Sequence, residues 1–189
     1  GLGDVYKRQV EQFSIISITA RIPMLASLRS RGKIQEFTNL LLQTQNISYA
    51  VFFLGYVGII FFAEFIVGLF DINVFFGDKI LIITFSYACI LNRWGGMMMI
   101  TSNQANLVIA HVVAAILSLG YLIILISFLD NGNLAIFPMA MIFGQILTVP
   151  YIARRTYATF SSNFLDFEIK QGIPYLVLLT IINVFYLYL

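Results

Sequence analysis

The stretch LVIAHVVAAILSLGYLIILISFL, residues 107–129, contains no Asp, Glu, Lys or Arg. A helix rises 1.5 Å per residue, so about 20 apolar residues cross a bilayer core of about 30 Å. The stretch also lacks the alternation of polar and apolar positions that marks a half-buried strand. It therefore predicts a transmembrane α-helix, and the rest of the chain can be interpreted from it.

The composition of the whole chain agrees with a membrane protein. Hydrophobic residues make up 60% and charged residues 11% of 189 positions, whereas about a quarter of the residues in soluble domains are charged. The single cysteine, Cys89, lies in an apolar run, which excludes an intrachain disulfide and offers no metal site. We expect no cofactor, and we expect no nucleic-acid partner because no basic stripe with interleaved aromatic residues lies outside the apolar runs.

Apolar runs of similar length recur, and their length predicts helices rather than a β-barrel. We expect an all-α, polytopic transmembrane helical bundle of about five full spans plus a truncated first helix, within a domain of residues 10–189. The first run is interrupted by Arg21 and Pro23, and Pro150 is expected near the end of the fifth. The expected spans are residues 10–28, 47–70, 80–100, 107–129, 134–153 and 172–189.

Polar links separate these runs. TSNQAN (101–106) and DNGN (130–133) predict turns between antiparallel neighbours. The links at 33–45 and 157–170 carry apolar residues at helical spacing, which predicts interfacial helices leading into the next span. A calmodulin-type target or a regulated lipid-binding segment is the alternative for these two links.

The placement of charge predicts the orientation. Basic residues follow the first and fifth runs, at Arg29, Arg31, Lys33, Arg154, Arg155 and Lys170. Acidic residues lie in the intervening turns, at Asp71, Asp78 and Asp130. Four crossings separate the two basic links, so both lie on one face, which is cytoplasmic by the positive-inside rule. We expect a multi-pass protein of the inner (plasma) membrane, with membrane lipids as its surroundings.

The opening GLGDVYKRQ, residues 1–9, resembles a sequencing adapter. Back-translated, DVYKRQ matches the transposon end used to fragment DNA for sequencing libraries. We therefore expect residues 1–9 to be an artefact and the chain to be a piece of a longer protein. The alternative is a genuine basic segment with Lys7 and Arg8, which the expected outward-facing start of the first run disfavours.

Two stretches carry a resemblance to a known family. Residues 20–70 combine a helix end at Pro23, the basic link LRSRGK and a long helix that closes on Leu-Phe. Residues 93–125 combine a helix ending in a polar turn with a following helix rich in small residues. Both resemble O-antigen and polysaccharide flippases of the MATE-related superfamily, over roughly residues 10–155 and more weakly over the last span.

The resemblance implies a fragment from the second half of such a transporter, from its second helix onward. It implies that the parent protein translocates lipid-linked oligosaccharides across the cytoplasmic membrane for surface polysaccharide synthesis. Such a flippase makes and breaks no covalent bond, so we expect no enzyme activity. It needs cations and hydrogen-bond donors along a wet path for the pyrophosphate and sugars, and a coupling ion is possible in principle.

Arg93 is the first candidate for this path, because it lies about 20 Å into its helix and a buried arginine is costly in a bilayer. Snorkelling to the cytoplasmic headgroups is the alternative. His111, at a similar depth on the next helix, could join Arg93 on an anionic headgroup, or form an interhelical hydrogen bond. Arg21 could meet substrate phosphate at the cytoplasmic entrance, or follow the positive-inside rule only.

The remaining candidates are uncharged. Asn92, Gln104 and Gln145 are donors within or near spans, and each can serve an interhelical hydrogen bond instead of a ligand. A cation-coupled multidrug exporter of the same superfamily is an alternative function, but it favours intramembrane carboxylates and only Glu64 offers one. A membrane enzyme of polysaccharide synthesis is a weaker alternative, because the acidic residues are scattered in short turns. A structural bundle without transport is the remaining alternative.

Overall fold

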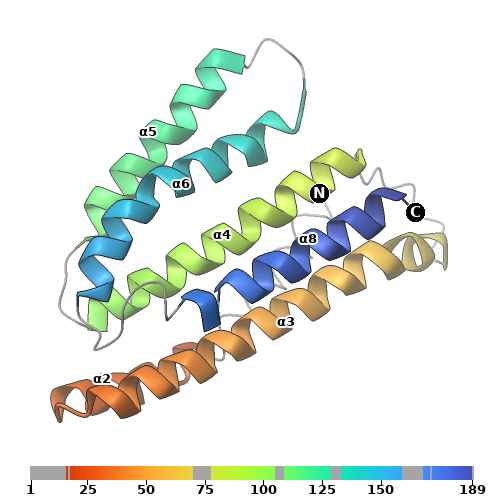
Figure 1. Cartoon of the computed structure of the whole chain (residues 1–189). Coiled ribbons are helices and arrows are strands. Elements are labelled where there is room, and N and C mark those ends of the chain that lie inside the picture. Colours follow the sequence, from red (N-terminus) through yellow and green to blue (C-terminus); the bar gives the residue numbers. More distant parts are fainter. Residues whose placement is uncertain are drawn as a thin grey trace. The chain divides into compact units, whose positions relative to one another are not determined.

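The computed structural model describes residue 16 and residues 18–69, 78–104, 109–128, 133–158, 168–170 and 172–188, with the backbone alone at 63–69 and 104. Within these ranges the chain is all-helical, as the sequence predicts (Figure 1). The main helices are α2 (Ile22–Ser30), α3 (Ile34–Leu69), α4 (Lys79–Gln104), α5 (Ala110–Phe128), α6 (Ile136–Tyr157) and α8 (Gly172–Tyr188). The expected artefact at residues 1–9 lies outside the described residues.

Four of these helices, α3, α4, α5 and α6, are long and apolar enough to cross a membrane. The shortest of the four, α5, has 19 residues, which correspond to about 28 Å of helix. The last predicted span corresponds to α8, which is apolar but has only 17 residues. Residues 10–15 and 17 of the first predicted span lie outside the described residues, and the described part is divided by a turn at Ala20 and Arg21 before α2 begins. The apolar helices indicate a membrane protein.

Two helices extend beyond the predicted boundaries at their polar ends. The helix α3 is continuous from Ile34, so the amphipathic link at 33–45 and the span predicted from residue 47 belong to one helix. The predicted turn at 101–106 is wrong for its first four residues, which complete α4. Thr101 and Ser102 donate their hydroxyl protons to carbonyls one turn earlier, over 2.9 and 2.8 Å. Their polar groups are thereby satisfied without water.

The helix α6 also differs from the prediction, because it continues past Pro150 to Tyr157 instead of ending near Ala153. Prolines are tolerated within membrane helices when neighbouring groups compensate for the lost hydrogen bond. At the other end, Asn133 Oδ1 accepts a hydrogen bond from the Ala135 amide over 2.9 Å just before α6 starts. Asn133 thus begins a turn at 134–135, whereas residues 130–132 of the predicted turn lie outside the described residues.

The chain divides into two compact units, and the boundary falls inside α8. The first unit contains α2, α3 and the part of α8 from Val177. The link LRSRGK ends α2 in a Schellman motif: Gly32 has φ +70°, and the Lys33 and Gly32 amides donate to Leu28 and Arg29 carbonyls over 3.0 Å each. Glycine is favoured at this position because a side chain strains the left-handed backbone.

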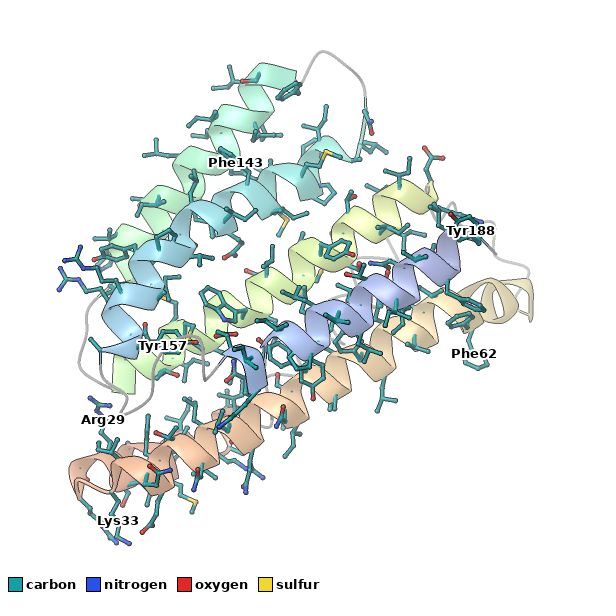
Figure 2. All side chains as sticks on the ribbon, in the orientation of Figure 1. Arg29, Lys33, Phe62, Phe143, Tyr157 and Tyr188 are labelled. Carbon is teal, nitrogen blue, oxygen red and sulfur yellow. The ribbon has the colours of Figure 1, made fainter. Side chains whose placement is uncertain are left out.

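The contacts within the first unit hold α2 and α8 against α3. The Arg29 guanidinium lies 5.7 Å from the centre of the Phe37 ring, and Figure 2 shows Arg29 and Lys33 near the start of α3. Farther along, the Tyr56 hydroxyl donates to Asn183 Oδ1, and the Phe61 and Phe185 rings lie 6.4 Å apart. The later residue on α3, Phe61, contacts the later residue on α8, Phe185. The two helices therefore run in the same direction.

The second unit contains α4, α5, α6 and the start of α8, and α6 packs against both α4 and α5 (Figure 1). Gln145 on α6 bonds Asn92 on α4, and Thr156 bonds Ser102 ten residues farther along α4. The two bonded pairs are separated by 53 and 54 positions in the sequence. Because this separation is almost constant, α4 and α6 are parallel and in register. Two parallel helices separated in sequence by one other helix agree with α5 returning in the opposite direction.

Candidate functional site

The carboxylate of Glu168 is buried immediately before α8, with only 6% of the residue exposed. Trp94 on α4 donates from Nε1 to Glu168 Oε1 over 2.7 Å. Tyr157, the last residue of α6, donates its hydroxyl proton to the same oxygen; Figure 2 shows Tyr157 at this end of α6. One carboxylate oxygen therefore joins two helices to the segment that leads into a third.

The second oxygen of this carboxylate lies against Gly172, the first residue of α8. A Cβ added at Gly172 would collide with Glu168 Oε2, so only glycine leaves room for this packing. We call Trp94, Tyr157, Glu168 and Gly172 the Glu168 cluster. It belongs wholly to the second unit, and Glu168 lies outside the four candidate spans.

Burial in the Glu168 cluster raises the pKa of the Glu168 carboxyl above its ordinary value, because removal from water disfavours the charged form. The hydrogen bonds from Tyr157 and Trp94 lower the pKa in part, because both stabilise the carboxylate. Burial is the larger influence. The cluster is therefore suited to holding a proton as well as hydrogen-bonding.

A second polar contact links α4 and α6 away from the Glu168 cluster, about three turns before Tyr157 on α6. Gln145 is buried, and its Nε2 donates to Asn92 Oδ1 over 3.1 Å. A Cβ added at Gly95 would lie 2.9 Å from Gln145 Oε1, so Gly95 leaves space for the amide. The structure thus brings together two predicted site residues, as an interhelical hydrogen bond, which is the alternative that the sequence offered.

The first unit contains a separate group of buried polar side chains on α3. Thr38, Thr44, Gln45 and Ser48 are each at most 5% exposed. Arg21 donates from Nη1 to Thr44 Oγ1 over 3.1 Å, and Thr44 donates to the Leu40 carbonyl. Gln45 differs from these neighbours, because neither its Nε2 nor its Oε1 has a hydrogen-bond partner although it is fully buried. We call Arg21, Thr44, Gln45 and Ser48 the α3 polar group.

An unpartnered buried amide is costly, because its donors and acceptor lose water without replacement. Such a group in a native structure calls for a ligand or a conformational role. The α3 polar group contains a guanidinium and an unpartnered amide, which match phosphate oxygens and hydroxyl groups rather than a metal. Among the described residues, no three His, Cys, Asp or Glu side chains gather as a potential metal site.

The other predicted residues are placed as follows. Arg93 is half-buried on α4, next to Trp94, and its role in binding stays a prediction. His111 is exposed on α5, a helix that packs against α6. The side chains of Gln104 and Glu64 lie outside the described part of the chain. Arg21 donates a hydrogen bond to Thr44 and thereby joins the α3 polar group; its contact with substrate phosphate stays a prediction.

Sequence reasoning missed Glu168 and Gln45. Glu168 stood in a link interpreted as an amphipathic interfacial helix, where a glutamate is expected to face water. The one local signal was an acidic residue shortly before the Gly-Ile-Pro start of an apolar run. Gln45 stood in LLLQTQ, where it looks no different from Gln43, which is exposed.

Comparison of the chain with protein families, with curated proteins and with solved structures found no match.

Proposed function

We propose that the chain is part of a membrane transporter that moves a lipid-linked oligosaccharide precursor across the cytoplasmic membrane. The observation that carries the proposal is Gln45, a fully buried amide without partners inside an apolar helix long enough to span a bilayer. Polar groups in such helices are expensive and tend to line solute paths. The identity of the solute is drawn from the family resemblance in the sequence.

The chemistry of the α3 polar group supports this choice of substrate. A guanidinium binds pyrophosphate oxygens through charge-assisted hydrogen bonds, and Arg21 is the cation of this group. An amide pairs with the hydroxyls of a sugar without adding charge, and the unpartnered side chain of Gln45 supplies one. The group forms no nucleophile–base pair, so it supports binding and passage rather than a covalent reaction.

A binding experiment tests this function on the 189-residue chain in lipid nanodiscs. The probe is a fluorescent polyprenyl-pyrophosphate oligosaccharide, with the same lipid lacking the sugars as reference. We expect Gln45→Leu to weaken binding of the glycosylated probe about tenfold, the cost of one lost hydrogen bond to a buried group. Gln43→Leu is the matched control, because Gln43 is exposed on the same turn and its loss should leave binding unchanged.

Equal binding of both lipids, or equal weakening by the two leucine substitutions, would contradict the proposal. Transport itself is tested with proteoliposomes that contain the glycosylated probe. In that assay, the fraction of probe accessible to an external sugar-cleaving enzyme should rise with time in the presence of the chain and remain constant without it.

The second candidate function is a cation-coupled exporter of hydrophobic drugs. The buried carboxylate of Glu168 favours it, because this protonatable group is held out of water, although it lies outside the four candidate spans. A cationic dye placed in the same proteoliposomes distinguishes the two functions. Dye movement driven by a pH gradient, without probe movement, would support the drug exporter over the flippase.

A further inference from the structure

We propose that the Glu168 cluster is a proton-binding site, in which a proton on Glu168 Oε2 holds α4, α6 and the segment before α8 together. The proposal concerns a site in the second unit and does not depend on which solute is transported. It assigns a ligand, the proton, to a cluster that the sequence did not reveal.

The hydrogen bonds decide which oxygen takes the proton. The Trp94 indole is only a donor, so Glu168 Oε1 must act as an acceptor toward it. Tyr157 donates to the same oxygen, which therefore already receives two hydrogen bonds. Oε2 is the remaining atom, and it lies so close to Gly172 that a Cβ there would collide with it.

We call the cluster closed when the Glu168 carboxyl is buried and open when it reaches water. The proton binds to the closed state. Burial raises the pKa of Glu168 more than the two hydrogen bonds lower it, whereas a carboxyl that swings out into water returns to ordinary acidity. The closed cluster therefore binds the proton more tightly than an open one does. By reciprocity, protonation stabilises the closed cluster, and loss of the proton favours release of the carboxylate to water.

The charged and titratable groups on the neighbouring elements do not reverse this direction. Those nearest to the cluster in sequence are Arg93 on α4, Arg154, Arg155 and Tyr157 on α6, Lys170 two residues after Glu168, and Tyr175 on α8; Lys79, Tyr87, Cys89, Tyr151, Tyr186 and Tyr188 lie farther along the same helices. Arg154, Arg155 and Lys170 are exposed, so water and salt screen their attraction for the carboxylate. Burial remains the larger influence on the pKa of Glu168.

The chain carries its own reporter, because Trp94 is its only tryptophan. The experiment follows tryptophan emission and acrylamide quenching of the 189-residue chain in nanodiscs as the pH rises. We expect one titration step, above which the emission shifts to the red and quenching increases as Trp94 loses its partner. Glu168→Gln, which is neutral at every pH, should remove the step, while Glu36→Gln, an exposed carboxylate on α3, should keep it.

Two further measurements keep the test decisive if Glu168→Gln folds poorly. The wild-type infrared spectrum should lose a protonated carboxyl band at the same midpoint as the fluorescence step. Tyr157→Phe removes a hydrogen bond that favours the carboxylate, so it should move that midpoint to higher pH. The proposal is overturned if no step occurs, if the step survives in Glu168→Gln, or if Trp94 becomes more accessible at low pH.

Discussion

The backbones of α5 and α6 touch where Gly120 faces Gly144: a Cβ added at Gly120 would lie 2.8 Å from the Gly144 Cα. On the other side of the same contact, a Cβ at Gly144 would lie 2.8 Å from the Leu117 carbonyl oxygen. Glycine pairs permit such close approach between membrane helices, where packing takes the place of the hydrophobic effect as the driving force. These two glycines therefore fix the distance between α5 and α6.

Substitution of either glycine should separate the two helices. We expect Gly120→Ala to lower the free energy of unfolding by roughly 1–3 kcal/mol, the usual cost of overpacking, because the new methyl group meets backbone atoms that cannot turn aside. Unfolding in mixed detergent micelles, followed by circular dichroism, measures the change. Gly96→Ala on α4 is the control: its Cβ would meet nothing within 4 Å, and alanine is the better helix former. Equal losses from both variants would refute the close contact.

The hydrogen bond between Gln145 and Asn92 can be measured with a double-mutant cycle. We expect a coupling free energy of about 0.6 kcal/mol between Asn92→Ala and Gln145→Ala, the average for hydrogen bonds between membrane helices. The same detergent unfolding experiment provides the four stabilities. Ser127→Ala combined with Asn92→Ala should give additive effects, because the exposed Ser127 hydroxyl bonds the Ile123 carbonyl on its own helix. A zero coupling for the first pair would mean that the amides are not bonded in the membrane.

The sequence could predict the helices because their signal is local. Every turn of the α5 sequence is apolar, so the helix can be predicted from its own residues. The basic link before α3 likewise contains Gly32, the glycine that its turn requires. The contacts that build the Glu168 cluster are not local: Trp94 and Glu168 lie 74 positions apart. A glutamate after a polar link looks solvent-exposed until a tryptophan and a tyrosine from two other helices are placed over it.

The polar residues near helix ends were also hard to predict. TSNQAN has the composition of a turn, yet Ser102 is fully buried and its hydroxyl lies 2.6 Å from the hydroxyl of Thr156 on α6. Neither residue alone indicates this partner. Hydroxyl residues satisfy themselves on the preceding helical turn, so their presence does not end a helix when a neighbouring helix covers them.

The stability of the chain should depend on pH through Glu168. Because burial raises the pKa of Glu168 in the folded state, the folded chain binds this proton more tightly than the unfolded chain does. The contribution to stability is fully present below the unfolded pKa and is lost as the pH rises through the folded pKa. We expect the wild-type melting temperature to fall across this window.

The Glu168→Gln variant isolates that contribution. Its melting temperature should change less with pH than that of the wild type, and the difference between the two should grow as the pH rises through the window. Glu36→Gln, at the exposed ion pair with Lys33, should follow the wild-type curve. Parallel curves for Glu168→Gln and the wild type would show that the carboxyl titrates with ordinary acidity.

Cysteine labelling can test the predicted orientation of the helices. Asp78 precedes α4 and Arg154 lies in the last turn of α6, so three helices separate them and they should lie on opposite faces. Lys33 precedes α3, and four helices separate it from Arg154, so these two should share the cytoplasmic face. Because Cys89 is the only native cysteine, single-cysteine variants at the three positions can be made in a Cys89→Ala background.

In intact cells, a membrane-impermeant thiol reagent should therefore label Asp78→Cys and spare both Lys33→Cys and Arg154→Cys. All three should react once the membrane is opened with detergent, which controls for burial. Labelling of Lys33→Cys and Arg154→Cys on different faces would mean that one of the four candidate helices does not cross. The parallel helices α4 and α6 would then be inserted in the bilayer in another way than predicted. The transport proposal, which depends on four membrane crossings, would lose its support.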